Sequence, residues 1–462
     1  MIRTDAAEAL CRRCVSALRG GLLVLLLLTT TTASRAEVVL RGVELYRFEL
    51  PLKSAFTTSK GSSDTCYGIF VRLLAEDAAT GEAYVGLGSI LPRTLVTNET
   101  LSDAWAGAVE MRRQLLSDPL VFSGDQLARD FSGVVDTVDA LSELANQQKL
   151  TTRRPPAGDR QLRATLCGYD QALLDLLGQI YRQPIWQLLN DAGRPWIKRS
   201  TPTYSVTDSP EKLSGKIAKL HSDYDGVRIK IGRDMDHDLA ALAAAAATLV
   251  DAGRGQSVIW VDVNQAWRDA STSVARLEEI ADTLENAGFT GTFLVEQPTD
   301  EHDYEALAQV TAAVRGWADS RPFTTQTIID ESIWILADVK RAVEMDAADL
   351  VNLKLQKTGG MIEAMRIGAY LAEHAPQTGV YIGGLVMTDV GAWGNVQLCF
   401  ALPRLDYQTS GAPRHNFPVN VADQPLTYSQ LRRIARPTTP GLGTGLDMEQ
   451  LEPYITRRYV ED

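Results

Sequence analysis

Three carboxylates and two lysines each end a short apolar segment between residues 226 and 360. The segments GVRIK, SVIWVD, GTFLVE, TQTIID and LVNLK end in Lys230, Asp262, Glu296, Asp330 and Lys354. Carboxylates that crowd together repel one another and favour a hard divalent cation with oxygen ligands. Mg²⁺ suits such a set, with Mn²⁺ as an alternative. A single acidic residue more often caps a helix or pairs with a lysine, but three in succession favour a metal site.

The two lysines, Lys230 and Lys354, are candidates for acid/base chemistry. A lysine with its reference pKa of about 10.4 is a poor base at neutral pH. A bound cation and a second lysine nearby would lower that pKa, because both favour the neutral amine. Two such amines on opposite sides of a carbon acid can remove a proton from one face and return it to the other. The alternatives are a salt bridge from Lys230 to Asp262 and a solvent-exposed Lys354.

The elements that must position these residues alternate between strand and helix. Each apolar segment is followed by a stretch long enough for one helix and two loops, which is typical of a parallel sheet. Strand ends at intervals of 24 to 34 residues predict a closed eight-stranded barrel, at whose mouth the charged residues would converge. The predicted strands end near Tyr204, Lys230, Asp262, Glu296, Asp330, Lys354, Gly383 and Tyr407.

The predicted fold class is α/β: a (β/α)8 TIM-type barrel with an N-terminal α+β capping domain. We expect a leader at 1–36, the capping domain at 37–160, the barrel at 161–424 and a segment at 425–462 that returns to the capping domain. Alternating strands predict an antiparallel meander over 37–90. Within it, the polar stretch PLKSAFTTSKGSSD predicts a flexible loop.

The first 36 residues have the pattern of a secretory signal peptide. Arg12, Arg13 and Arg19 precede an apolar run, GGLLVLLLL, and small residues follow it. The alternatives are an organelle presequence, a membrane anchor or a start codon placed too early. The chain is exported or organellar if this leader functions, and cytoplasmic otherwise. Beyond the leader, Cys66, Cys167 and Cys399 stand in apolar surroundings, which predicts buried free thiols.

Net charge and hydropathy limit the classes of partner that the chain is expected to bind. A formal net charge of −12 argues against nucleic acid, because phosphate binding needs a basic surface. Beyond the leader, no segment is long and apolar enough to span a bilayer, so the mature chain should carry no membrane span. We expect a small-molecule carboxylate substrate and a homo-oligomer.

The motifs RIK, VDVNQAW, VEQP, DES and NLKLQKTGG, in this order, resemble the enolase superfamily and its muconate-lactonizing subgroup. Dipeptide epimerases and N-acylamino acid racemases are the members that the chain resembles. The resemblance implies that the three carboxylates bind Mg²⁺ and that the two lysines are the acid/base groups. It also implies a supporting role for Asn264 and a substrate-capping role for the loop at 54–64.

Three positions depart from the family pattern. Arg228 stands where the first lysine of K-x-K is usual, and Met387 or Thr388 where relatives carry a Glu. Dipeptide epimerases show Asp-x-Asp near the eighth strand, whereas this chain has only Asp406 in RLDYQTSG. We therefore expect Arg228 and Asp406 to contact the substrate or support the site. Since no histidine ends the sixth or seventh strand, the two-lysine arrangement is favoured over the His–Asp pair of mandelate-racemase-like relatives.

The resemblance implies a Mg²⁺-dependent racemase or epimerase of an amino-acid derivative or dipeptide. It would remove the proton α to a carboxylate through an enediolate intermediate. A muconate-type cycloisomerase and an o-succinylbenzoate synthase-like syn-dehydratase share that intermediate and are the alternatives. A metal-binding barrel without turnover is a third hypothesis.

Overall fold

The computed structural model describes residues 37–57, 61–148, 150–151, 160–408, 416–427, 429 and 432–460. The predicted leader at 1–36 lies outside them. Among the described helices, none combines the length and the apolar character that crossing a bilayer requires. Cys66, Cys167 and Cys399 are buried free thiols, as predicted.

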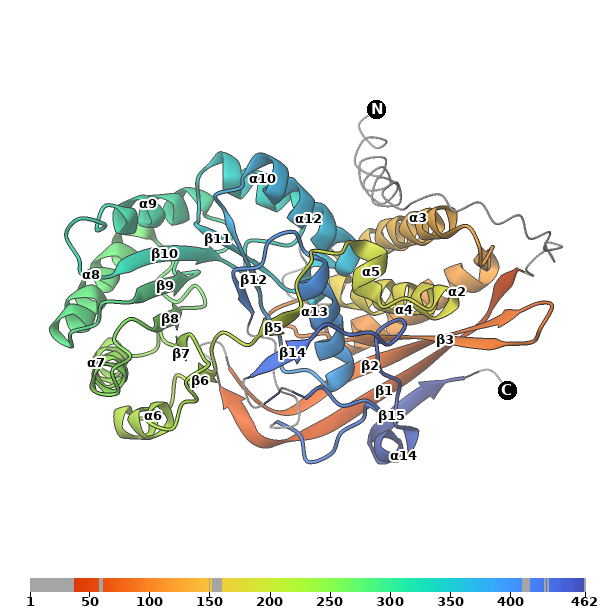
Figure 1. The fold of residues 1–462 in the computed structure, drawn as a ribbon, viewed down its shortest axis with the longest axis horizontal. Coiled ribbons are helices and arrows are strands. Elements are labelled where there is room, and N and C mark those ends of the chain that lie inside the picture. The colour runs from red at the N-terminus through yellow and green to blue at the C-terminus, as the bar shows by residue number, and fades with distance from the viewer. Residues whose placement is uncertain are drawn as a thin grey trace, which may run out of the picture.

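An antiparallel sheet forms the N-terminal part, on the right in Figure 1. Its main path has the order β15-β1-β2-β3, and β4 pairs with the start of β1. The helices α2 (Leu101–Ser117) and α3 (Leu127–Asn146) follow β3 in the chain. The strands are β1 (Val38–Thr57), β2 (Ser62–Asp77), β3 (Ala83–Ile90), β4 (Val121–Phe122) and β15 (Ile455–Tyr459).

Residues 51–57 and 62–64 of the polar stretch belong to strands, so the prediction of a flexible loop was wrong there, and residues 58–60 lie outside the described residues. β1 continues to Thr57 and β2 begins at Ser62, with Thr57 paired to Ser62 and Pro51 to Thr65. Pairing that starts in the apolar part of a hairpin can extend along polar residues, because the ladder uses backbone groups. The backbone N–H of Lys53 also donates to the carbonyl of Asn416, which follows the last barrel strand.

The helix α4 (Arg163–Tyr181) joins the two halves of the molecule, and α5 (Ile185–Leu189) follows it. Nearly all of α4 is buried. A Cβ atom at Gly88 of β3 would lie 1.8 Å from the carbonyl oxygen of Gly168 on α4. The strand and the helix therefore touch through their backbones, which only glycine permits.

We expect Gly88→Ala to lower the free energy of unfolding by about 1–3 kcal/mol, because the added methyl group overpacks the β3–α4 contact. Chemical denaturation measures this change. Gly133→Ala on α3 is the matched control, since a Cβ there would meet nothing within 4 Å beyond its chain neighbours and its own helix backbone; it should be neutral or stabilising. A Gly88→Ala variant as stable as the native chain would contradict the close contact.

Asp175, a fully buried residue of α4, binds two other parts of the chain. Its carboxylate accepts from the backbone N–H of Leu87 on β3 and from that of Leu442, both over 2.7 Å. Burial raises the pKa of this carboxyl to about 7, although these hydrogen bonds oppose the rise.

We therefore expect Asp175 to make stability depend on pH. The folded chain holds this proton more tightly than the unfolded chain, so the contribution is fully present below about pH 4. It is lost as the pH rises towards about 7, near the pKa in the folded chain. Melting temperatures of Asp175→Asn between pH 5 and 8 should fall less with pH than those of the native chain. The exposed Asp319→Asn should keep the native slope; equal slopes for all three proteins would contradict the expectation.

The second sheet consists of eight parallel strands in chain order, which supports the predicted α/β barrel class. Ser200 donates its backbone N–H to the carbonyl of Gln408 over 2.8 Å, so the residues before β6 contact β13. The strands are β6 (Thr203–Tyr204), β7 (Gly226–Lys230), β8 (Val258–Asp262), β9 (Thr292–Glu296), β10 (Thr324–Ile329), β11 (Leu350–Leu353), β12 (Gly379–Ile382) and β13 (Tyr407–Gln408).

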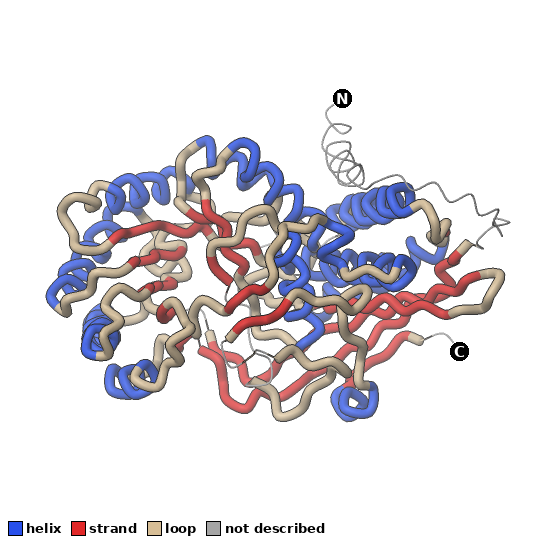
Figure 2. The backbone as a smooth tube through the Cα atoms, in the orientation of Figure 1, coloured by secondary structure: helices blue, strands red, loops and turns tan. Residues whose placement is uncertain are grey.

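Helices follow the strands along the chain and lie outside the sheet, where Figure 2 shows them in blue. Aspartates cap several of them; Asp269, for example, accepts from the N–H of Thr272 at the start of α8. The helices are α6 (Pro210–Ile217), α7 (Met235–Asp251), α8 (Ala270–Asn286), α9 (Tyr304–Arg315), α10 (Leu336–Glu344), α11 (Leu355–Thr358), α12 (Met361–His374) and α13 (Asp389–Ala401).

The end of the chain returns to the N-terminal sheet. β14 (Arg433–Ala435) pairs with β5 (Trp196–Lys198), and α14 (Met448–Leu451) and a short 3₁₀ helix (Glu452–Tyr454) lead into β15. β15 pairs antiparallel with β1. The N-terminal sheet, α4, α12 and α13 share one apolar core.

Candidate active site

The structure places the five predicted residues at one end of the barrel. Lys230, Asp262 and Glu296 are the last residues of β7, β8 and β9, and each is paired in register with the next. Asp330 and Lys354 each follow directly on the last residue of their strands, β10 and β11. All five are buried, and the three carboxylates are fully enclosed. The carboxyl ends of parallel strands meet at one mouth, so the sequence located this group correctly.

Asp262 and Glu296 share a basic partner. Nη2 of Arg228 donates to Oδ2 of Asp262 and, over 2.6 Å, to Oε2 of Glu296. Nζ of Lys230 donates to the same oxygen of Asp262 over 2.5 Å. Arg228, predicted to support the site, therefore contacts two of the candidate metal ligands directly. The salt bridge from Lys230 to Asp262, the alternative at this position, is also present.

Asp330 has two lysine partners. Lys354 donates to its Oδ2, and Lys357 donates to its Oδ1 over 2.7 Å and to its carbonyl oxygen. Lys354 is only 7% exposed, so the alternative of a solvent-exposed lysine was wrong. Lys357, which is almost fully buried on α11, was not among the residues predicted from the sequence. Its position, three residues after Lys354 and therefore on the same side of a helical turn, could have indicated it.

A polar support surrounds Glu296. Nε1 of Trp260 donates to its Oε2 and Nδ2 of Asn352 to its Oε1, both over 2.9 Å. Nη1 of Arg228 donates to the hydroxyl of Tyr381 over 3.0 Å. None of these three partners, Trp260, Asn352 and Tyr381, was predicted from the sequence. Trp260 and Asn352 precede Asp262 and Lys354 by two residues, so alternation along a strand directs them into the same barrel.

Asn264 links one lysine to a fourth carboxylate. Its Oδ1 accepts from Nζ of Lys230 over 3.0 Å, and its Nδ2 donates to Oε1 of Glu331 over 3.1 Å. Its backbone is left-handed, with φ of 49°. The predicted supporting role of Asn264 thus has specific contacts, whereas Glu331 was not among the predicted residues.

The structure does not bring Asp406 to this group. Asp406 precedes β13, and its carboxylate accepts from the N–H of Val380, near the start of β12, over 2.7 Å. It lines a cavity of about 380 Å³ together with the first residues of β8, β11 and β12. A five-residue strand is roughly 16 Å long, so Asp406 lies at the opposite end of the barrel. The predicted substrate role of Asp406 is therefore wrong.

The charges of the site shift its pKa values strongly. Burial raises the pKa of Glu296 to about 8, although Arg228 opposes the rise. Burial would also raise the pKa of Asp262, but Lys230 and Arg228 hold it below its usual value. The same competition at Asp330 leaves its pKa well below the usual range, because Lys354 and Lys357 lie beside it.

The lysines respond in opposite directions. Burial lowers the pKa of Lys357. Burial would lower the pKa of Lys354 too, but Asp330 and Glu296 raise it above its ordinary value. The lowered pKa expected for a base is therefore absent at Lys354 with these neighbours. A further positive charge near Asp330 would be needed to bring it down.

The donor chemistry of the carboxylates fits Mg²⁺. Asp262, Glu296 and Asp330 offer only oxygen atoms and are fully buried, and the charge of Asp330 acts to raise the pKa values of the other two. As placed, they contact basic side chains: among the described residues, no three His, Cys, Asp or Glu side chains enclose a common cation position. Arg228 already joins Asp262 and Glu296 through one nitrogen, so one positively charged group can reach both.

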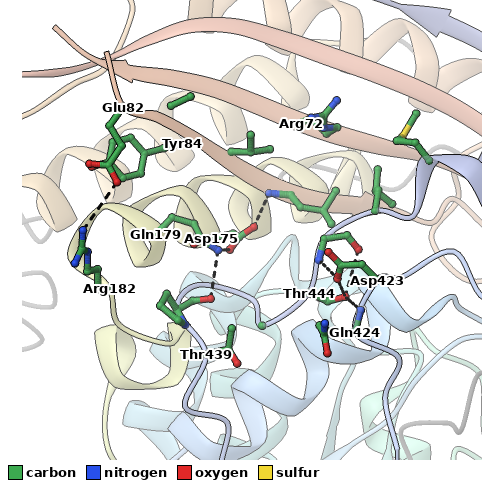
Figure 3. A pocket seen from close by; sticks show the side chains of 18 residues that line it. Arg72, Glu82, Tyr84, Asp175, Gln179, Arg182, Asp423, Gln424, Thr439 and Thr444 are labelled. Atoms are coloured by element: carbon green, nitrogen blue, oxygen red, sulfur yellow. Dashed lines mark hydrogen bonds and ion pairs between the residues drawn. The ribbon is translucent and has the colours of Figure 1, made fainter. Parts of the chain in front are cut away.

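The cavity drawn in Figure 3, of about 660 Å³, lies elsewhere, between β2, β3, the end of α4 and the C-terminal segment. Its charged side chains have partners: Arg72 pairs with Glu44, and Arg182 with Glu82. Asp423 accepts from the N–H of Gly445 over 2.7 Å. We therefore place the candidate active site at the barrel mouth.

Comparison with known proteins gives matches along most of the chain. The model of the family described as "Enolase C-terminal domain-like" matches residues 213–450, just over half of the 462 residues. An L-Ala-D/L-Glu epimerase of Clostridium acetobutylicum is 27% identical over 340 residues, which are 73% of this chain and 80% of that protein. A chloromuconate cycloisomerase of Cupriavidus pinatubonensis is 29% identical over 289 residues, 62% of this chain and 71% of that protein.

A solved structure shares the fold. It is the dipeptide epimerase of Cytophaga hutchinsonii complexed with Mg and the dipeptide D-Ala-L-Val. The TM-score is 0.71 at 21% identity, and the match covers 91% of this chain and 99% of that one.

Proposed function

Because the chain belongs to the enolase superfamily, we propose that it is a Mg²⁺-dependent isomerase that removes the proton α to a substrate carboxylate and returns it. The relatives that match it include epimerases, a racemase and a cycloisomerase. The observation that carries the proposal is the placement of Lys230 and Lys354 at strand ends on either side of three buried carboxylates. We favour racemisation or epimerisation of an amino-acid derivative or dipeptide, because two lysines can serve both faces of the α-carbon.

The proposed roles follow from chemistry and position. Asp262, Glu296 and Asp330 would hold the metal. When bound, Mg²⁺ would attract the substrate carboxylate and offset the negative charge that develops as the α-proton leaves. One of Lys230 and Lys354 would accept that proton while the other donates one to the opposite face. Asn264 and Glu331 would keep Lys230 oriented through the contacts described above.

The charge balance of the site supports a neutral lysine. In the described part of the chain, four acidic and four basic side chains meet there: Asp262, Glu296, Asp330 and Glu331 with Arg228, Lys230, Lys354 and Lys357. These eight charges cancel when all are ionised. A divalent cation and a carboxylate monoanion together would add one positive charge. That surplus favours loss of a proton from one lysine, which is the form a base requires.

Cycloisomerisation is the second candidate, favoured by the match to a chloromuconate cycloisomerase. It would share the two lysines and the three carboxylates. Syn-dehydration would begin with the same proton abstraction and stays an alternative. A metal-binding barrel without turnover would need none of the lysine chemistry.

Hydrogen exchange at the α-carbon tests the proposed function. Dipeptides, N-acyl amino acids and muconate-like acids are incubated with the protein and Mg²⁺ in deuterated buffer. NMR should show deuterium entering the α-position of at least one compound class, and EDTA should stop the exchange. Inversion of configuration would identify a racemase or epimerase, and a lactone product a cycloisomerase. No metal-dependent exchange with any class would contradict the proposal.

The leader at 1–36 and the homo-oligomer stay predictions. Mass spectrometry of the protein recovered from its source would show whether residues 1–36 have been removed. Light scattering of the purified protein would measure its molar mass against the 50.5 kDa of one chain.

A further inference from the structure

Arg228 reaches the centre of the carboxylate group. It stands two residues before Lys230 on β7, so its side chain enters the barrel below that lysine. Its Nη2 donates to both Asp262 and Glu296, and the side chain is only 6% exposed. Water therefore screens this positive charge poorly. One nitrogen joins two of the three carboxylates proposed to hold the metal.

A second set of contacts, with two aromatic side chains inside the barrel, holds the guanidinium of Arg228 in place. Nη1 donates to the hydroxyl of Tyr381, and Cζ lies 5.0 Å from the ring centre of Trp260 and 5.7 Å from that of Tyr381. A planar group with several donors can make these contacts together, whereas a lysine ammonium is a compact point charge. Nε is buried and has no hydrogen-bond partner in the described part of the chain. The two carboxylates and the rings therefore determine how the guanidinium lies.

These contacts place a permanent charge beside the proposed metal position. An arginine does not release its proton in proteins, so its charge persists at every working pH. The charge compensates Asp262 and Glu296, which would otherwise repel each other in a buried site. It also repels any second cation that approaches the same oxygens. The first effect stabilises the folded chain, whereas the second weakens the binding of a metal ion.

We propose, on the basis of the proposed function, that Arg228 is a built-in counter-cation: it neutralises Asp262 and Glu296 until Mg²⁺ binds. Metal binding then requires Nη2 to give up at least one of the two carboxylates. Arg228 thus stabilises the protein in the absence of metal and weakens its affinity for Mg²⁺. Arginine in place of the lysine usual in the K-x-K motif gives this chain a weaker, more reversible metal site.

Calorimetric titration of the full chain with MgCl₂, without substrate and after removal of metal by EDTA, tests the proposal. Arg228→Met removes the charge and keeps an apolar stem, and Arg228→Lys keeps the charge on one nitrogen. Arg113→Met is the control: it changes the net charge of the chain by the same amount, but on the exposed surface of α2, away from the site. We expect Arg228→Met to bind Mg²⁺ at least about tenfold more tightly than the native chain. The Mg²⁺ affinity of Arg228→Lys should lie between those of the native chain and Arg228→Met. Arg113→Met should bind Mg²⁺ as the native chain does.

Thermal unfolding supplies the second measurement. In EDTA, Arg228→Met should melt below the native chain, and Mg²⁺ should raise its melting temperature by more than it raises the native one. If Arg228→Met does not fold, Arg228→Lys decides: tighter Mg²⁺ binding supports the proposal, and equal or weaker binding overturns it. A folded Arg228→Met with unchanged or weaker Mg²⁺ affinity also overturns it.

The outcomes separate this inference from the proposed function. A native chain that neither binds Mg²⁺ nor catalyses α-proton exchange would overturn both. A native chain that binds Mg²⁺ and catalyses exchange, with Arg228 variants of unchanged affinity, would overturn only the role of Arg228.

Discussion

Lys354→Ala should slow α-proton exchange by about 10²–10⁴-fold, the range in which a positioned acid or base acts. The variant removes one of the two proposed acid/base groups and leaves the three carboxylates in place. Lys354→Arg should be as slow, because arginine keeps the positive charge beside Asp330 but cannot accept a proton. The rate of deuterium incorporation at the α-carbon, followed by NMR with Mg²⁺ present, measures the loss.

The two lysines should also differ in the substrate enantiomer from which each removes the α-proton. If each serves one face of the α-carbon, Lys354→Ala should retain slow exchange with one enantiomer and Lys230→Ala with the other. Lys212→Ala, on the exposed side of α6, is the control and should exchange both enantiomers at the native rate. Full activity of Lys354→Ala would exclude Lys354 as an acid/base group and would contradict the proposed two-lysine mechanism.

Asp330→Asn should abolish Mg²⁺ binding and also destabilise the fold by about 3–5 kcal/mol, the usual effect of removing one partner of a buried ion pair. The carboxylate of Asp330 faces two buried ammonium groups, those of Lys354 and Lys357. An amide cannot compensate both charges. Titration calorimetry with MgCl₂ and chemical denaturation measure the two effects separately.

A second substitution shows whether the instability comes from charge. Asp330→Asn combined with Lys357→Met removes one carboxylate and one lysine, so it should recover part of the lost stability but none of the metal binding. Asp191→Asn, in a half-exposed ion pair with Arg436, is the control and should change stability by less than about 1 kcal/mol. A stable Asp330→Asn that still binds Mg²⁺ with native affinity would exclude Asp330 as a ligand.

The sequence predicted the positions of the main charged groups because strand ends leave a local signal. An apolar run of about five residues that stops at a charged residue marks where a buried strand leaves the sheet. Lys230, Asp262 and Glu296 are the last residues of their strands, and Asp330 and Lys354 follow theirs directly. Parallel strands in chain order then bring such ends together without further information.

The errors came from features that depend on distant partners. Asp406 lies directly before β13, a strand of only two residues. Nothing in the local sequence shows whether it precedes or follows so short a strand. Its carboxylate is turned to the backbone of β12, at the other end of the barrel. The stretch at 51–64 has no apolar alternation, yet its residues up to Thr57 and from Ser62 extend β1 and β2, because these strands are already paired beside it.

The sequence alone determined which residue types could do chemistry and that they would meet at one barrel mouth, because strand periodicity and order are written along the chain. Only the tertiary structure decided which charges touch. Arg228 of β7 joins Asp262 of β8 to Glu296 of β9, and Lys357 of the following helix α11 shares Asp330 with Lys354. Such partners depend on side-chain reach and burial in the folded barrel, where a charge must find its counter-charge in space.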